Sequence, residues 1–109
     1  MSWTTESKLG NTALTTSRAA ISKNFYTRDP QYAVIEVTTA ETETGDLYLY
    51  DSSDGVTWSQ VATVAVDAVS NTVWRLDART TPIRNQCRVE MKLDAGTGTV
   101  SSVFVTWSA

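Results

Sequence analysis

The sequence has no histidine and only one cysteine among its 109 residues. Without histidine, the commonest general base and metal ligand is missing, and every catalytic arrangement that pairs serine or cysteine with histidine is excluded. One cysteine cannot close a disulfide within the chain or supply a thiolate zinc site. We therefore expect a protein that is not an enzyme and that holds no metal ion or cofactor.

Basic side chains are outnumbered, at 9 against 12 acidic ones, which gives a net charge of −3. A general nucleic-acid-binding protein needs a basic surface, because it displaces counterions from phosphates. No apolar run approaches the roughly 20 residues that cross a membrane, and residues 1–6 lack the basic start and apolar core of a secretion signal. The sequence predicts synthesis in the cytoplasm, with neither nucleic acid nor membrane as a partner.

Residues that favour strands dominate the composition, which includes 18 threonines, 12 valines and 11 serines. Threonine and valine carry a branched Cβ, which suits a pleated sheet better than a helix. Apolar and charged side chains alternate without exception over residues 87–93, as in a strand with one buried face. Cys87 lies in the apolar register and is predicted to be a small buried side chain. Glu90 lies in the charged register and is predicted to face outward.

Similar period-two patterns predict further strands, separated by turn residues. The predicted strands cover residues 2–8, 14–22, 32–38, 46–50, 60–66, 72–77, 86–93 and 99–107. Helix is an alternative only for 14–22. Residues 38–45 are predicted to form an exposed loop, 67–71 a connection between two strands, and the last two strands a C-terminal hairpin. The pattern predicts one all-β domain over residues 1–109, an antiparallel β-sandwich or jelly roll of seven or eight strands, with 1–12 as a candidate N-terminal arm.

One stretch contains the pattern Ser-x-Asp-Gly-x-x-Trp, formed by Ser52, Asp54, Gly55 and Trp58 and preceded by Asp51. Both carboxylates can accept hydrogen bonds from turn amides, and glycine adopts the positive φ that other residues resist. Trp58 is then expected to anchor the next strand in the core. Calcium binding is a weaker alternative, because two carboxylates fall short of the six to eight oxygens that Ca²⁺ prefers.

This pattern resembles the hairpin of discoidin-type, galactose-binding-like jelly rolls and that of small jelly-roll proteins in tailed-phage virions. Residues 83–91 and 95–100 are similar to the closing strands of those phage proteins, with an arginine in the penultimate strand and a Gly-Thr-Gly turn before the last. Discoidin domains are longer and commonly have a disulfide that joins their termini. This chain has neither feature, so the phage-type resemblance is favoured.

The resemblance implies a non-enzymatic virion structural protein of a bacteriophage, most simply a capsid decoration or cement protein made in the host cytoplasm. It implies a homo-oligomer, a dimer or trimer, that binds the major capsid protein or other virion subunits. Two alternatives stay open. One is a carbohydrate-binding module or tail adhesin domain, and the other is a tail-tube or connector subunit.

Aromatic residues near the chain end and on one predicted strand are candidates for subunit contacts, since interfaces favour buried aromatic anchors. Trp3 is interpreted either as a lid on the sandwich or as the anchor of an arm that docks on a neighbour. Tyr48 and Tyr50 either cover the second face of their sheet or form part of an interface. The predicted subunit-interaction residues are Trp3, Thr4, Thr5, Leu9, Tyr48 and Tyr50.

The remaining tryptophans are predicted to be core anchors. Large aromatic side chains dominate the energetics of small β cores, and this reasoning applies to Trp58, Trp74 and Trp107. A stacking platform for a sugar ring is the alternative, and it would serve the carbohydrate-binding function.

Overall fold

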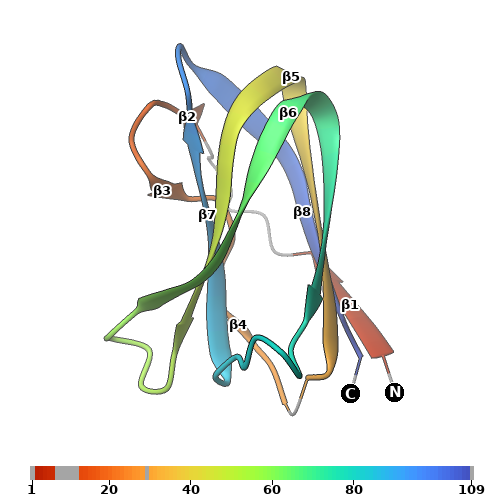
Figure 1. Cartoon of the computed structure of the whole chain (residues 1–109). Helices are drawn as coiled ribbons and strands as arrows, with labels where there is room; N and C mark the ends of the chain where they lie inside the picture. Colours follow the sequence, from red (N-terminus) through yellow and green to blue (C-terminus); the bar gives the residue numbers. More distant parts are fainter. Residues whose placement is uncertain (1, 7–12, 29, 109) are drawn as a thin grey trace.

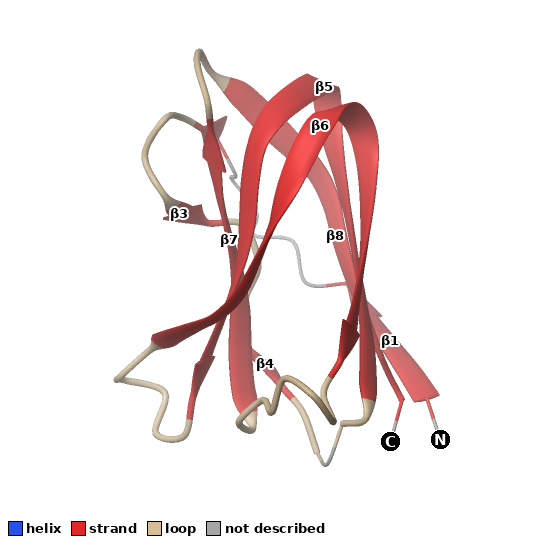
Figure 2. Cartoon of the chain, in the orientation of Figure 1, coloured by secondary structure: helices blue, strands red, loops and turns tan. Residues whose placement is uncertain are grey.

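The computed structural model describes the backbone of residues 2–6, 13–28 and 30–108, and the side chains of residues 13–28, 30–40 and 44–108. The described residues form eight strands and no helix, and every strand pair is antiparallel (Figures 1 and 2). The strands are β1 (Ser2–Glu6), β2 (Ala13–Leu14), β3 (Ala19–Ala20), β4 (Phe25–Tyr26), β5 (Tyr32–Ser52), β6 (Ser59–Asp77), β7 (Gln86–Leu93) and β8 (Gly98–Ser108). The prediction of an all-β, antiparallel sandwich is confirmed.

In the described part of the chain, no helix is long and apolar enough to span a membrane.

Strand β5 organises the fold, because it belongs to both layers of the sandwich. One of its edges pairs with β6. The other edge pairs with β8 over Tyr32–Thr39 and with β7 over Gly45–Ser52. One half-sheet therefore runs β1-β8-β5-β6, and the other carries β3 and β4 beside β7, followed by β5 and β6. The β5–β6 hairpin arches over the top of the molecule and joins the two layers (Figure 1).

Two predicted loops lie inside these long strands, so both predictions are wrong. Residues 38–45 belong to β5 and residues 67–71 to β6. The ladder between the two strands continues through the bend with register shifts near Thr38 and Glu43, and Ala68 takes a φ of 50°. The polar side chains of Asp67, Ser70 and Asn71 are tolerated in β6 because they are exposed to solvent, while the strand stays paired with β5 on either side of the bend.

The predicted C-terminal hairpin is also wrong, although both of its strands form. β7 and β8 each pair with β5, in different half-sheets, rather than with each other. The turn at residues 94–97 therefore carries the chain from one layer to the other. The reason is the length of β5, which offers separate pairing sites to the two strands. Residues 14–22 include the end of β2 and the short strand β3 rather than a helix.

The core fills the space between the two half-sheets with aliphatic and aromatic side chains. Trp107 is 1 % exposed and packs with its ring centroid 5.7 Å from that of Phe25. Trp74 is also buried, so the prediction of a core position is confirmed for these two tryptophans. The other fully buried side chains include Leu14, Ile21, Ile35, Leu47, Leu49, Val89, Met91, Leu93, Val103 and Val105.

Cys87 is buried in this core as predicted. Burial raises the pKa of its thiol to about 12; the nearby charge of Asp51 adds to the increase and Arg84 opposes it.

Because the thiolate is the reactive form, we expect Cys87 to resist a thiol reagent such as Ellman's reagent at mildly alkaline pH in the folded protein. One thiol per chain should react once guanidinium has unfolded it. Labelling of the folded protein at the rate of a free cysteine would contradict the buried placement.

Candidate functional site

The side of β6 that faces away from β5 is the longest unpaired strand edge in the described part of the chain. β6 has 19 residues, Ser59–Asp77, and β5 is the one described strand that pairs with it. In an antiparallel strand, alternate residues direct their N–H and C=O groups to each side. This side, which we call the β6 edge, therefore presents a row of backbone donors and acceptors to a partner strand.

The side chains of β6 offer little protection against pairing. Soluble proteins commonly shield long edges with lysine, proline or inward-pointing charges. β6 contains no lysine or proline, and its charged residues are Asp67, Arg75 and Asp77. Asp77 lies at the end of the strand and forms an ion pair with Arg79, with 3.0 Å between Oδ2 and Nη2. The edge is thus chemically suited to accept another strand.

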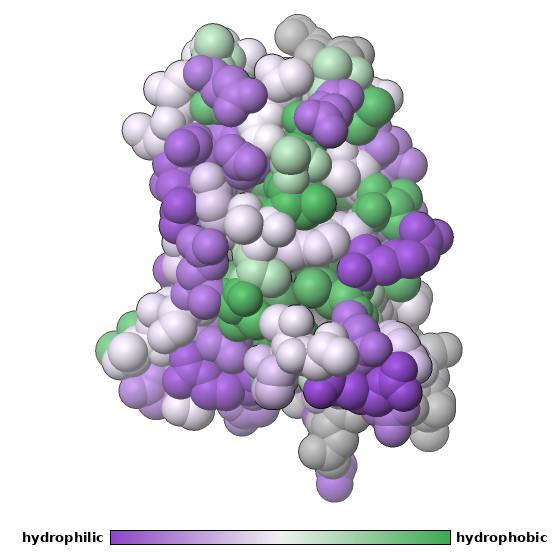
Figure 3. All heavy atoms as spheres, viewed as in Figure 1, coloured by the Kyte–Doolittle hydropathy of each residue, from purple (hydrophilic) through white to green (hydrophobic). Residues whose placement is uncertain are grey.

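Apolar side chains accompany the β6 edge on both of its faces. On the inward side, Ala62, Val64 and Leu76 pack against the core but remain partly exposed. On the outward side, Val69 and Val73 are 44 % and 40 % exposed. Figure 3 shows apolar surface between hydrophilic margins on the face that carries β6. A neighbouring strand would cover apolar surface as well as backbone groups.

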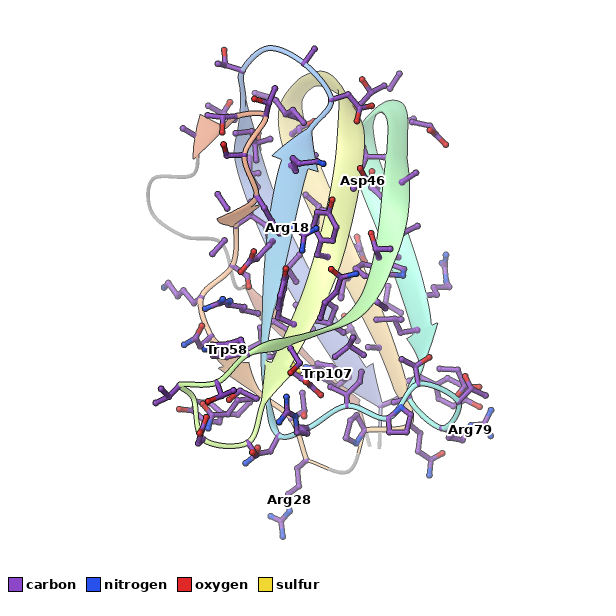
Figure 4. The ribbon with its side chains drawn as sticks, turned by 60° about the vertical axis from the view of Figure 1, so that its left-hand side comes forward. Arg18, Arg28, Asp46, Trp58, Arg79 and Trp107 are labelled. Atoms are coloured by element: carbon purple, nitrogen blue, oxygen red, sulfur yellow. The ribbon has the colours of Figure 1, made fainter. Side chains whose placement is uncertain are left out.

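A second cluster lies on the outer face of the half-sheet formed by β7 and β5. The guanidinium carbon of Arg18 lies 3.7 Å from the ring centroid of Tyr48, which is therefore buried although it faces away from the core. Arg18 also donates hydrogen bonds to the hydroxyl of Tyr50 and to Oε1 of Gln60. The hydrogen bond to Tyr50 raises the pKa of Arg18. Both tyrosines thus cover the second face of their sheet, where Figure 4 shows Arg18.

Trp58 belongs to this outer cluster, so the prediction that it anchors the core is wrong. It is half-buried, and the guanidinium carbon of Arg88 lies 4.5 Å from its ring centroid and 5.6 Å from that of Tyr50. Arg88 Nε lies 2.9 Å from Oε2 of Glu90. Glu90 is buried despite its outward register, because the outer face is covered at this point. A guanidinium group therefore lies over one face of the Tyr48 ring and another over one face of the Trp58 ring.

The Ser-x-Asp-Gly-x-x-Trp turn is held by its own polar groups. Oδ1 of Asp54 accepts hydrogen bonds from the N–H groups of Val56 at 2.8 Å and Thr57 at 2.9 Å. The hydroxyl of Ser52 donates to the same carboxylate and accepts from the N–H of Gly55, whose φ is 78°. Across the described residues, no group of three or more metal-ligating side chains occurs.

Asp51 has a different partner from the one expected at the sequence level. It binds Arg84 in the connection between β6 and β7. Its Oδ1 lies 2.8 Å from Nη2 and 3.1 Å from Nε, and its Oδ2 accepts from the backbone N–H of Arg84 at 3.0 Å. This ion pair ties that connection to the end of β5.

Three donors to one carboxylate lower the pKa of Asp54 to about 2, chiefly the backbone N–H groups of Thr57 and Val56 and then the hydroxyl of Ser52. The folded-state pKa lies below the ordinary value of 3.8, so the stabilisation is present above about pH 4 and is lost as the pH falls through about 2. We expect the difference in unfolding midpoint between the wild type and Asp54→Ala to be largest above pH 4 and to shrink toward pH 2.

The matched control is Ser53→Ala in the same turn. It removes no carboxyl group, so its small effect should not change with pH. A difference for Asp54→Ala that stays constant down to pH 2 would contradict the hydrogen-bonded carboxylate.

A cavity of about 350 Å³ opens at the end of the sandwich between the segments that contain Thr27, Pro30 and Ile83. Arg28 borders it, but its side chain extends away from the body of the molecule in Figure 4. Apart from Arg28, the described residues that line the cavity are uncharged.

The predicted subunit-interaction residues do not form one surface. Trp3, Thr4 and Thr5 lie in β1, paired with Trp107, Thr106 and Val105 of β8 at the opposite end of the half-sheet from β6. Leu9 lies outside the described residues. The β6 edge was missed because β6 was expected to be two short strands, and its only signal in the sequence is a long stretch that is rich in valine and poor in charge.

No protein-family model and no curated protein matches the chain. A solved structure from the disulfide-linked pili of Bacillus endospore appendages aligns with 99 % of this chain and 90 % of its own chain, with a TM-score of 0.44 and 18 % sequence identity.

Proposed function

We propose that the chain is a structural subunit that joins neighbouring subunits by pairing strands at the β6 edge. The observation that carries this proposal is the 19-residue length of β6 with β5 as its one described partner strand. Pairing along a sheet edge gives affinity through main-chain hydrogen bonds, and the accompanying side chains give specificity. The exposed Val69 and Val73 would add buried apolar area.

A non-enzymatic role is part of the proposal. The carboxylates of Asp51 and Glu90 form ion pairs with Arg84 and Arg88. The aromatic rings of Tyr48, Tyr50 and Trp58 are contacted by arginine side chains. These contacts support a rigid scaffold better than a catalytic centre or a sugar-binding platform.

The finer proposal is a decoration protein on the capsid of a tailed phage, and it is supported by the resemblance of the Ser52–Trp58 turn and of the closing strands. A virion surface protein of this kind binds the major capsid protein in many copies. A tail adhesin or connector would be present in few copies.

The test is the assembly state of the purified protein, measured by light scattering coupled to size-exclusion chromatography over a wide concentration range and by negative-stain electron microscopy. We expect assemblies larger than the monomer. For the finer proposal, we expect quantitative mass spectrometry of purified virions to give hundreds of copies per particle. A protein that stays monomeric and is absent from the particles would overturn the proposed function.

A further inference from the structure

The β6 edge is bent at its middle, and this restricts which strand can pair with all of it. The midpoint of Ser59–Asp77 is residue 68, where Ala68 has a φ of 50°. Two of the three register shifts against β5 fall between Asp67 and Asn71, and the third lies between Gln60 and Ala62. A straight strand can follow one arm of this edge but cannot follow both arms across the arch.

A second copy of β6 meets this requirement, because its own bend lies at its own middle. In antiparallel orientation about Ser70, the bent segment of residues 67–71 in one copy lies beside residues 69–73 of the other, so the two bends overlap, and each arm of one strand runs beside the opposite arm of the second. β1 is the other candidate within the chain, but it has five residues and would cover about a quarter of the edge. We propose that two copies of the chain pair β6 with β6, antiparallel, around a two-fold axis near Ser70. This inference rests on the proposed function and names its partner.

Such pairing joins the half-sheets of the two copies into continuous sheets. The half-sheet that ends β8-β5-β6 in one copy continues into β6-β5-β7 of the second, and the same happens on the other side of the axis. The partly exposed Leu76 of one copy then lies beside the arm that carries Ala62 and Val64 of the other. The dimer therefore closes the side of each core that β6 leaves partly exposed.

The side chains on the outward face of β6 are also complementary under this symmetry. With the axis near Ser70, Asp67 lies opposite Val73 of the second copy, and Arg75 of that copy is its diagonal neighbour. Diagonal pairs across strands lie within reach of long side chains. Because the axis is two-fold, the Asp67–Arg75 contact forms twice, and so does the contact between Val69 and Val73.

The first test replaces the exposed valines of the edge by glutamate, in the double variant Val69→Glu/Val73→Glu. Both positions are exposed, at 44 % and 40 %, so the variant should keep its far-ultraviolet circular dichroism and a cooperative unfolding transition. In the proposed register the new carboxylate at position 73 faces Asp67 of the second copy, and the one at position 69 is diagonal to both new carboxylates of that copy, so repulsion should raise the dimer dissociation constant by about 100-fold or more. The matched control is Val56→Glu, because Val56 is 81 % exposed in a turn remote from the seam and should leave the dimer intact.

The second test places a thiol at the axis with Ser70→Cys. Cys87 is buried, so the new cysteine is the reactive one. Oxidation, or a short bis-maleimide, should link two copies rapidly at low protein concentration. Ala95→Cys, in an exposed turn, should link far more slowly.

A wild type that is monomeric at every concentration would overturn the inference, whatever its occupancy on virions. An assembly that survives Val69→Glu/Val73→Glu, or in which Ser70→Cys links no faster than Ala95→Cys, would also overturn it while leaving the proposed function standing. Dimers with rapid Ser70→Cys linkage and loss of assembly in the glutamate variant would support it.

Discussion

Replacing Gly45 with alanine is expected to destabilise the protein by about 3 kcal/mol, at the upper end of overpacking effects. Gly45 lies on β5 opposite Leu93 of β7 and Val66 of β6, where the two neighbouring strands approach below the arch. A Cβ at this position would overlap the backbone oxygen of Lys92 and lie 3.0 Å from the Cα of Leu93. Backbone atoms cannot rotate away as a side chain does, so the β5–β7 ladder must open locally.

The measurement is the midpoint of urea unfolding, followed by tryptophan fluorescence. Gly96→Ala is the matched control, since Gly96 has a φ of 74° and no atom within 4 Å of the added Cβ. The alanine at position 96 must only adopt the left-handed conformation, which should lower the free energy of unfolding by roughly 1–2 kcal/mol. If Gly45→Ala were no more destabilising than this control, the close approach of β7 would be wrong.

Replacing Trp107 by alanine is expected to lower the stability of the fold more than replacing any other tryptophan. Trp107 is 1 % exposed and packs on Phe25 between the layers, and replacing a core tryptophan by alanine typically costs about 3–5 kcal/mol. A small domain has a total stability of only about 5–15 kcal/mol, so Trp107→Ala should lose a large share of its stability and unfold at a much lower temperature than the wild type.

Trp58→Ala provides the comparison, because Trp58 is half-buried and stacks on Arg88 outside the core. A cation–π contact at such a site contributes about 1 kcal/mol. Thermal unfolding followed by circular dichroism should therefore separate the two variants clearly. Equal losses of stability would place Trp58 in the core and contradict the outer cluster.

The alternation of apolar and charged residues correctly predicted the strand at residues 86–93. One face of β7 packs on the core, so every second residue there is apolar. The same pattern cannot name the partner of a strand. β7 and β8 are joined by a short turn with hairpin-like chemistry, yet each pairs with β5. Both strands find a place beside β5 because β5 is 21 residues long. The polar residues in the middle of β5 predicted a loop, although the strand continues through them.

The candidate site was harder to predict from the sequence than the fold. An unpaired edge is defined by the strand that is missing beside it, and that depends on the topology of the whole sheet. The outer cluster was hidden for another reason. Arg18 is far from Tyr48 and Tyr50 in the chain, and only the folded structure brings its guanidinium group over them.

The central place of β5 also determines how the native state opens. This strand is hydrogen-bonded on one side to β6 and on the other to β8 and β7. Those of its amide protons that are bonded to β7 or β8 can reach solvent only when an interior ladder of a half-sheet opens, so their exchange should report the global free energy of unfolding. Amides at the outer margins, in β6 and β1, can exchange through local fraying. Protection from exchange should therefore decrease outward from β5, and pairing of β6 with a neighbour would slow exchange on that side alone.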